Sequence, residues 1–506
     1  MLTTTNPRTG HTEDSGIPLT TTEEVARRTE RASAAFVALG ELGRTWRAGL
    51  LDALADGLET ERDTLVATAD GETGLGPVRL GGELTRSIFQ FRLFAEALRD
   101  GGYLEATIDH AATTVLGASP DVRRLLIPIG PVAVFGSSNF PFAFSVAGGD
   151  TASALAAGCP VVLKAHGSHP LTSLRSWEAL TTAATAFGAP EGTLGIVFGT
   201  KAGATLVADP RIKAVGFTGS LSGGQALMDI VANREEPIPF YGELSSLNPL
   251  IITSAAAAAR TTEIAEGLFT SFTASAGQLC TKPGVAFIPR GAAGEQLVAD
   301  LVARVDAAAS QPLLNSRIFD SFGEIEGRLT ADGRAQVAAA GDDSGAGFAI
   351  APRLLTIDAA SMTPEATEEA FGPLLVVAWY NDVASLTAGL RQVPNSLTAT
   401  IHSEPGEEQL VAELAQEVSP HVGRLVFNGY PTGVRVSWAQ HHGGPWPATN
   451  SQHTSVGVSA VRRFLRPFVW QGAPESSLPA ELRDDFTGVP RRVDGVLTLA
   501  APTTAP

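Results

Sequence analysis

Cysteine is almost missing from the 506-residue sequence, which contains only Cys159 and Cys280. Two cysteines so far apart match neither the disulfide framework of a small secreted protein nor the paired spacing of a zinc site. We therefore expect no metal site. The polar start, MLTTTNPRTGHTEDSG, also lacks the apolar segment of a secretory signal. Both absences favour a reducing compartment, and we expect the protein to be cytoplasmic.

Long apolar runs and positive charge are scarce as well. The least polar stretch, residues 145–163, is interrupted by glycines, an aspartate and a proline, so it does not resemble a membrane span. Lysine and arginine total 36 against 53 acidic residues, which gives a net charge of -17. Such a polyanion is repelled by nucleic acid and by anionic lipid, so we expect neither as a partner. The length exceeds one ordinary core and predicts two or three domains.

Apolar periodicity predicts an α/β fold. Spacings of three and four favour helices from Thr21 to about Asp100, one of them over Trp46–Ala69, with Thr21 or Thr22 as the first cap. LEATIDHAATTV and VRRLLIPIG are expected to form two long projecting strands. Strands and helices then alternate over residues 129–233, which is typical of a parallel sheet covered on both faces. A second α/β region starts near Glu243. The Pro-rich tail after the strand RFLRPFVWQ is expected to be irregular or packed on a neighbour.

Three residues are candidates for catalysis. Cys280, in SAGQLCTKPG, offers a thiol, although a lone cysteine is usually a small buried hydrophobe, as we expect for Cys159. Glu243, in YGELSSLNP, follows an apolar strand; it is either solvated or ion-paired, or a general base whose pKa is raised in a dry cleft. Asn139, in FGSSNFPF, is either a turn former or a donor to a developing oxyanion.

Other segments favour a nucleotide. Lys164, one of only four lysines, ends the strand CPVVLK, at the edge where open α/β sheets bind ligands. FTGSLSGG joins a strand to a helix and suits a pyrophosphate, but it lacks the GxGxxG spacing and also fits an ordinary turn. His441 and His442 cannot share one face of an element, and we interpret both as loop residues without a carboxylate cluster.

The order of these segments is more specific than any one of them. NFP, VVLK, FTGS, GEL, GQxC, EEAFGP and FNGYPTG follow one another, and this order resembles the aldehyde dehydrogenase superfamily from about Thr21 to Gln471. HGGPWPATNSQHTSVG and RRFLRPFVWQ resemble its branch of 2,5-dioxovalerate (α-ketoglutaric semialdehyde) dehydrogenases and related NADP-dependent enzymes.

The resemblance implies a role for each matching residue. Cys280 corresponds to the nucleophile that forms a thiohemiacetal and then a thioester, Glu243 to the residue that activates water, and Asn139 to the oxyanion hole. The remaining matches imply cofactor contacts: Lys164 with the adenosine ribose, the loop of Gly219, Ser220 and Gly224 with the pyrophosphate, and Glu369 and Phe371 with the nicotinamide ribose and ring.

Three departures refine these expectations. Gly167 stands where NAD-preferring members usually carry a glutamate, which would repel a 2′-phosphate, so we expect NADP to be preferred, with NAD possible. LSSLNP replaces the usual LGGKSP after Glu243. Arg435 stands where the branch typically has an acidic residue, and it is a candidate for contact with a carboxylated aldehyde.

The resemblance implies a Rossmann-type cofactor domain (1–103 and 127–241), an α/β catalytic domain (242–458), and a β oligomerisation arm with a C-terminal tail (104–126 and 459–506). Exposed strands in such an arm need pairing, so we expect a homodimer or homotetramer. The leading substrate is α-ketoglutaric semialdehyde. The alternatives are a broad aliphatic or aromatic aldehyde dehydrogenase, an acyl-transferring relative, or a non-catalytic scaffold of the same fold.

Overall fold

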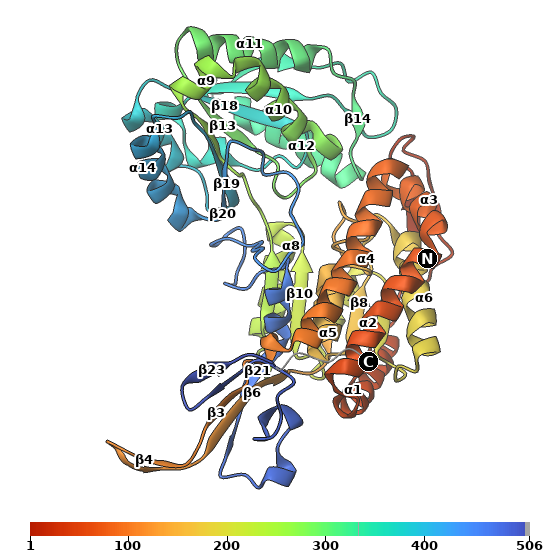
Figure 1. Cartoon of the computed structure of the whole chain (residues 1–506). Coiled ribbons are helices and arrows are strands. Elements are labelled where there is room, and N and C mark those ends of the chain that lie inside the picture. Colours follow the sequence, from red (N-terminus) through yellow and green to blue (C-terminus); the bar gives the residue numbers. More distant parts are fainter. Residues whose placement is uncertain (332, 501–506) are drawn as a thin grey trace.

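The computed structural model describes residues 1–331 and 333–500. One sheet has the strand order β11-β10-β7-β8-β9, and all its adjacent strands are parallel (Figure 1). Four helices connect these strands, so the predicted alternation over residues 129–233 is confirmed. The elements are β7 (Val132–Phe135), α5 (Gly149–Ala157), β8 (Val161–Lys164), α6 (Pro170–Phe187), β9 (Leu194–Val197), α7 (Thr200–Ala208), β10 (Ala214–Thr218), α8 (Leu221–Ala232) and β11 (Phe240–Glu243).

The strand order reverses beside β7. The strands β8 and β9 lie on one side of β7, whereas β10 and β11 lie on the other. The loops that follow β7 and β10 therefore lead in opposite directions along the sheet. A reversal of this kind opens a crevice at the carboxyl ends of the strands, where open α/β sheets bind dinucleotides. Phe135, Lys164, Thr218 and Glu243 end four of these strands at that edge.

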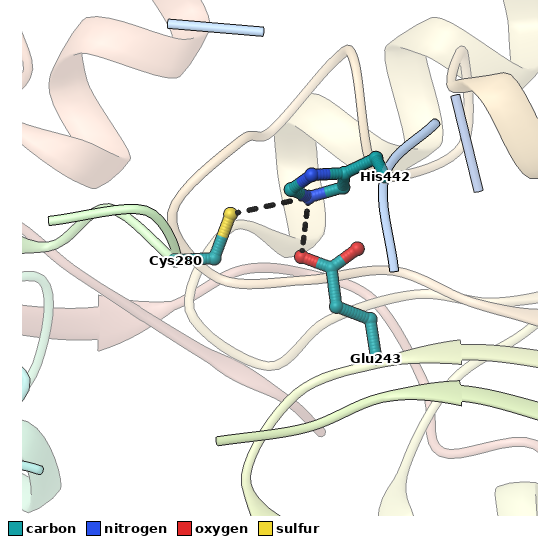
Figure 2. A group of neighbouring side chains, drawn as sticks. All are labelled: Glu243, Cys280 and His442. Atoms are coloured by element: carbon teal, nitrogen blue, oxygen red, sulfur yellow. Dashed lines mark hydrogen bonds and ion pairs between the residues drawn. The ribbon is translucent and has the colours of Figure 1, made fainter. Parts of the chain in front are cut away.

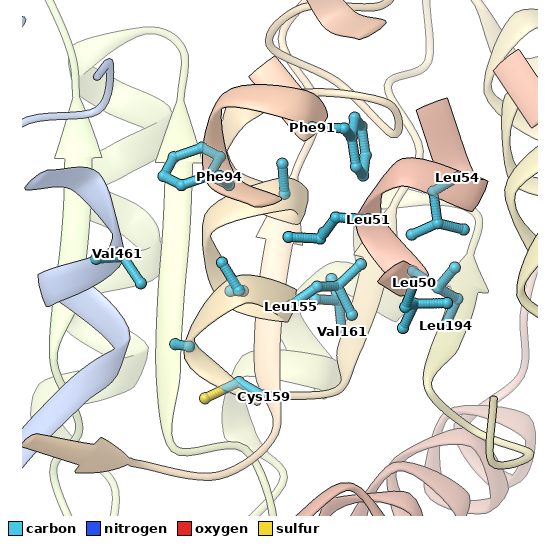
Figure 3. Packing of buried hydrophobic residues seen from close by; sticks show 14 of the residues in the cluster. Leu50, Leu51, Leu54, Phe91, Phe94, Leu155, Cys159, Val161, Leu194 and Val461 are labelled. Atoms are coloured by element: carbon cyan, nitrogen blue, oxygen red, sulfur yellow. The ribbon is translucent and has the colours of Figure 1, made fainter. Parts of the chain in front are cut away.

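Four helices precede this sheet: α1 (Thr22–Glu41), α2 (Gly43–Thr60), α3 (Arg62–Thr73) and α4 (Pro77–Asp100). Thr21 caps α1 in a reciprocal capping box with Glu24, as the sequence predicts. The single helix expected from Trp46 to Ala69 is divided at Glu61, whose backbone leaves the helical region. Figure 3 shows how this layer packs on the sheet through apolar side chains that include Leu51, Leu54, Phe91, Phe94, Leu155 and Val161.

A second sheet has the order β15-β17-β18-β13-β12-β19-β20, in which only β15 is antiparallel to its neighbour. Its strands are β12 (Leu250–Ile252), β13 (Val285–Pro289), β15 (Gln336–Ala340), β17 (Arg353–Asp358), β18 (Leu374–Tyr380), β19 (Ser396–His402) and β20 (Val422–Phe427). The accompanying helices are α9 (Ser254–Ala259), α10 (Thr261–Thr273), α11 (Ala292–Asp306), α12 (Ser316–Thr330), α13 (Val383–Leu390) and α14 (Glu408–Val418).

A third sheet projects from the body (Figure 1) and joins segments far apart in the sequence. The strand β21 (Leu465–Gln471) pairs with β6 (Val122–Pro128), followed by β3 (Thr107–Asp109), β22 (Arg491–Val493) and β23 (Val496–Thr498). We refer to this sheet as the arm.

Two expectations about this region are wrong. The first projecting strand is divided, because β4 (Ala112–Thr114) turns back on β5 (Gly117–Ser119) as a separate hairpin. The C-terminal tail is not wholly irregular, because β22 covers the edge of β3 that would otherwise lack a partner. Among the described residues, no helix combines the length and hydropathy that crossing a bilayer requires.

Candidate active site

Cys280 lies in the tight turn between the end of α10 and strand β13. The backbone is left-handed at Ser275, Ala276 and Gly277, just before this turn. A Cβ on Gly277 would lie 2.2 Å from the carbonyl oxygen of Gly372, so only glycine fits there. The turn therefore holds the thiol on a rigid, closely packed backbone rather than on a free loop.

Asn248 fixes the same turn from the neighbouring strand connection. Its side-chain amide donates to the carbonyl oxygens of Cys280 and Lys282, both at 2.9 Å. Its own carbonyl oxygen accepts the hydroxyl of Ser246 at 2.6 Å. The segment LSSLNP, a departure from the usual family sequence, thus supports the backbone that carries the thiol.

Cys280, Glu243 and His442 form one compact cluster (Figure 2). The Nε2 atom of His442 lies 3.0 Å from Oε1 of Glu243 and 3.6 Å from Sγ of Cys280. Ser455 donates its hydroxyl to the other carboxylate oxygen at 3.0 Å. Glu243 is only 3% exposed and His442 only 2%, so these contacts are strong in their low-dielectric surroundings.

The surroundings of the cluster shift the pKa values of its two acids in opposite directions. Burial raises the pKa of the Cys280 thiol well above its ordinary value, and the nearby Glu243 carboxylate raises it further. Burial alone would also raise the pKa of Glu243, but His442 and hydrogen bonds from His442, Cys280 and Ser455 outweigh it, so that pKa is lowered. The upward shift expected for Glu243 is therefore wrong. Glu243 is the ionised member and Cys280 the protonated one.

Asn139 lies in the loop after β7 and is buried. Its side-chain amide donates to the carbonyl oxygen of Gln278 at 3.0 Å, two residues before the thiol. Arg79 on α4 donates to the carbonyl oxygen of Asn139 at 2.7 Å and so fixes its backbone. The structure thus brings the predicted amide to the turn of the predicted nucleophile.

The thiol opens onto a cavity of about 250 Å³ between α4, the loop after β7 and the turn of Cys280. Two arginines and two phenylalanines contribute to its wall. The lining residues are Arg79, Gly82, Glu83, Arg86, Phe140, Phe144, Leu279, Cys280, Thr281, Gly433 and Val434. This volume suits a small organic molecule.

Two of the residues expected to contact the adenosine part lie at and just after the end of β8. Burial lowers the pKa of Lys164. Gly167 follows in the next loop, and a Cβ there would meet no atom within 4 Å. The position therefore has room for a ligand group beside the strand end.

The predicted pyrophosphate loop forms the start of α8. Ser220 caps this helix by accepting the backbone N–H of Gly223 at 3.2 Å. The N–H of Gly219 donates to the carbonyl oxygen of Glu243, which ties the end of β10 to that of β11. A Cβ on Gly224 would lie 2.3 Å from a methyl of Leu244, so glycine allows the helix to approach the site.

Glu369 lies in the segment before β18 and contacts the residues that follow β11. Its carboxylate accepts the Ser245 hydroxyl at 2.6 Å and the Ser246 N–H at 3.0 Å. Burial raises the pKa of Glu369 above its ordinary value. Phe371 follows in the same segment and is half-buried. The roles suggested for both residues stay predictions.

Two of our interpretations need correction. His441 and His442 lie in a loop, as expected, but His442 does have carboxylate and thiol partners. No spacing rule could reveal them, because the partners lie far away in the sequence and meet only through the packing of both sheets. Arg435 is exposed and is absent from the cavity wall, although Gly433 and Val434 line it.

Known proteins resemble this chain over most of its length. The model of the "Aldehyde dehydrogenase family" matches residues 1–451. The chain belongs to the aldehyde dehydrogenase family. It is 41% identical to an α-ketoglutaric semialdehyde dehydrogenase of Acinetobacter baylyi, over 94% of this chain and 92% of that protein. It is 40% identical to α-ketoglutaric semialdehyde dehydrogenase 2 of Azospirillum brasilense, over 93% and 91%.

Solved structures of the family share the fold. A variant aldehyde dehydrogenase of Bacillus cereus superposes with a TM-score of 0.80 at 22% identity, covering 93% of this chain and 92% of the other. PnpE in complex with nicotinamide adenine dinucleotide superposes with a TM-score of 0.80 at 21% identity, covering 93% of both chains. The protein is therefore an aldehyde dehydrogenase of α/β fold, in a family that uses NAD or NADP.

Proposed function

We propose that this aldehyde dehydrogenase oxidises α-ketoglutaric semialdehyde to the dicarboxylic acid with NADP, in the cytoplasm, as a homodimer or homotetramer. The observation that carries the catalytic part is the cluster of thiol, carboxylate and imidazole, whose thiol lines a small cavity. The substrate rests on the names of two relatives that are 40% and 41% identical.

The first half of the reaction uses Cys280 and Asn139. The sulfur attacks the aldehyde carbon, and the thiol proton leaves toward Glu243, the nearby ionised group able to accept it, which releases the proton again before the second half of the reaction. The Asn139 amide stabilises the alkoxide of the thiohemiacetal. When bound, NADP supplies the hydride acceptor that converts this adduct to a thioester.

The second half uses Glu243. Because its pKa is lowered, the carboxylate is ionised throughout the neutral range and accepts a proton from the water that attacks the thioester. Nε2 of His442 and the hydroxyl of Ser455 hold one carboxylate oxygen each. With the carboxylate ionised, Nε2 is the protonated ring nitrogen and donates to it.

Features of the strand ends fit a dinucleotide. Lys164 ends β8 and Ser220 begins α8 on either side of the crevice beside β7. The N-terminus of α8 presents backbone N–H groups and a positive dipole end, both of which suit a pyrophosphate. Gly167 leaves open space where the adenosine ribose would lie.

The preference for NADP is supported by local charge. The loop after β8 has no carboxylate at position 167. Burial is the main cause that holds the pKa of His166 well below its ordinary value, and interactions with His169, Lys164 and Arg317 lower it further. Burial disfavours ions of either sign, so the support for a 2′-phosphate dianion comes from the basic side chains of Lys164 and Arg317 near this loop.

The oligomer is supported by the arm. Its outer strand β21 exposes Phe468 and Val469, and no strand of the described chain pairs with its second edge. Such an edge needs a cover or a partner strand.

The direct test is a panel of aldehydes with NADP and with NAD, using Cys280→Ala as the blank. We expect the highest kcat/KM for α-ketoglutaric semialdehyde with NADP, and no turnover in the blank. Free acid as the product, with or without added coenzyme A, separates this function from acyl transfer. A protein that turns over no aldehyde would be a scaffold, and a broad preference for uncharged aldehydes would contradict the substrate.

A further inference from the structure

Three arginines lie near the thiol, and two of them already donate hydrogen bonds to backbone carbonyl oxygens. Arg79 donates to the carbonyl oxygen of Asn139 and lies 3.3 Å from the Glu83 carboxylate. Arg424 donates to the carbonyl oxygens of Pro431 and Gly433 in the loop beside the cavity. Both therefore hold backbone segments of the cavity wall, and each leaves one nitrogen, Nη1 of Arg79 and Nε of Arg424, without a hydrogen-bond partner among the described residues.

Arg86 is different. It lines the cavity together with Cys280, yet its Nε and Nη2 atoms are buried and have no hydrogen-bond partner within residues 1–331 and 333–500. The guanidinium lies over the ring of Phe144, 5.0 Å from its centroid, and 5.8 Å from that of Phe140. These rings fix the cation without satisfying its N–H groups, which leaves a buried donor that is costly unless a ligand pairs with it.

The carboxylate nearest to Arg86 along α4 does not supply this partner. One oxygen of Glu83 accepts the backbone N–H groups of Phe142 and Ala143, at 2.7 and 3.0 Å. Its other oxygen faces Arg79. Since Glu83 is used in holding the loop after β7, it makes no hydrogen bond to Arg86. The carboxylates of Glu83 and Glu243 act on Arg86 only through the field of their charges, and Nε and Nη2 of Arg86 stay without a partner among the described residues.

We propose that Arg86 is the carboxylate-binding residue of the substrate cavity, so that the enzyme selects aldehydes bearing a carboxylate at the end remote from the carbonyl. This inference rests on the proposed function and specifies how its substrate is recognised. The guanidinium offers parallel N–H donors to the carboxylate, and Phe140 and Phe144 exclude water from the pair. The aldehyde carbon then points to Cys280 across the same cavity. Arg435 lies outside the cavity wall, so Arg86 replaces it as the candidate for contact with the substrate carboxylate.

The test compares Arg86→Met with Arg92→Met, an exposed arginine of the same helix, as the matched control. We measure KM and kcat for α-ketoglutaric semialdehyde and for pentanal, an uncharged aldehyde of the same carbon number. Loss of a charged hydrogen bond predicts a KM about 10- to 100-fold higher for the semialdehyde in Arg86→Met. The KM for pentanal, which has no carboxylate, should change much less than the KM for the semialdehyde, and Arg86→Lys should fall between Arg86→Met and the wild type. An equal loss on both aldehydes, or on neither, would overturn the proposal.

A second measurement does not depend on turnover or on the variants folding equally well. Glutarate, a dicarboxylate without an aldehyde, should protect Cys280 of the wild-type protein from alkylation by iodoacetamide, whereas pentanoic amide should not. Protection by glutarate supports the anion subsite even if α-ketoglutaric semialdehyde proves a poor substrate, in which case only the proposed substrate fails. Equal alkylation with and without saturating glutarate would overturn the subsite even if the semialdehyde is a good substrate.

Discussion

Replacing His442 by leucine should separate the two halves of the reaction. The imidazole makes a buried hydrogen bond of 3.0 Å to Glu243, and leucine removes it while keeping the site dry. A hydrogen bond to a charged group contributes about 1.5–3 kcal/mol, so its loss disfavours the ionised carboxylate by roughly 10- to 150-fold.

The direction in which pH changes the rate of hydrolysis follows from the groups that shift the pKa of Glu243. In the wild-type protein, His442 is the largest influence that lowers the pKa of Glu243 against burial, so the carboxylate stays ionised well into the acid range. Without His442, burial dominates and the pKa of Glu243 rises. Thioester hydrolysis should therefore fall about 10- to 100-fold at about pH 6, and less at about pH 9, where the carboxylate ionises again.

The assay is rapid mixing of enzyme, NADP and aldehyde across this pH range. We expect His442→Leu to show a burst of reduced cofactor followed by slow turnover, and hydroxylamine, which attacks thioesters without a protein base, to restore turnover. His442→Gln, which keeps an N–H donor, should be less affected. The neighbouring His441→Leu, which removes no contact with Glu243 or Cys280, is the control. A hydrolysis rate in His442→Leu equal to that of the wild type at all pH values would refute the reasoning.

Three further substitutions test other parts of the site and the arm. Asn139→Ala should lower kcat about 100- to 1000-fold while Cys280 remains open to alkylation, and a normal kcat would remove Asn139 from the oxyanion hole. Gly167→Glu should lower kcat/KM for NADP at least about tenfold, with little change for NAD, as judged by the ratio of the two constants. Phe468→Asp should shift the protein toward monomers in light scattering after size-exclusion chromatography, and an unchanged mass would place the subunit interface elsewhere.

The sequence predicted those parts of the fold and site that depend on local patterns. Strand–helix alternation and the order of short motifs were sufficient for the parallel sheets and for singling out Cys280, Glu243 and Asn139. The division of the long N-terminal helix at Glu61 was missed, because no proline or glycine marks it. The divided arm strand was missed because its hairpin turn is formed by Val115 and Leu116, which are poor turn signals and fully exposed.

Long-range partners could not be predicted in the same way. The contact of His442 with Glu243 joins residues 199 positions apart, and Arg86 reaches the thiol from a helix formed early in the chain. A charged residue on an amphipathic helix resembles a solvated one until its neighbours are known. The sequence therefore led to Arg435, near a recognised motif, and did not single out Arg86, the residue that we propose for this role, because its burial depends on the packing of α4 against the loop after β7.

In the proposed mechanism, the proximity of Glu243 and Cys280 also explains when the base acts. Two anions so close together disfavour each other, and the raised pKa of the thiol together with the lowered pKa of the carboxylate shows that the carboxylate holds the charge at rest. Once the sulfur is part of a thioester, it can no longer become an anion, and this repulsion disappears. Glu243 is then an ionised base beside an uncharged acyl group, at the step that needs water to be deprotonated. The same pair of side chains thus keeps the thiol protonated before substrate arrives and favours hydrolysis after the thioester has formed.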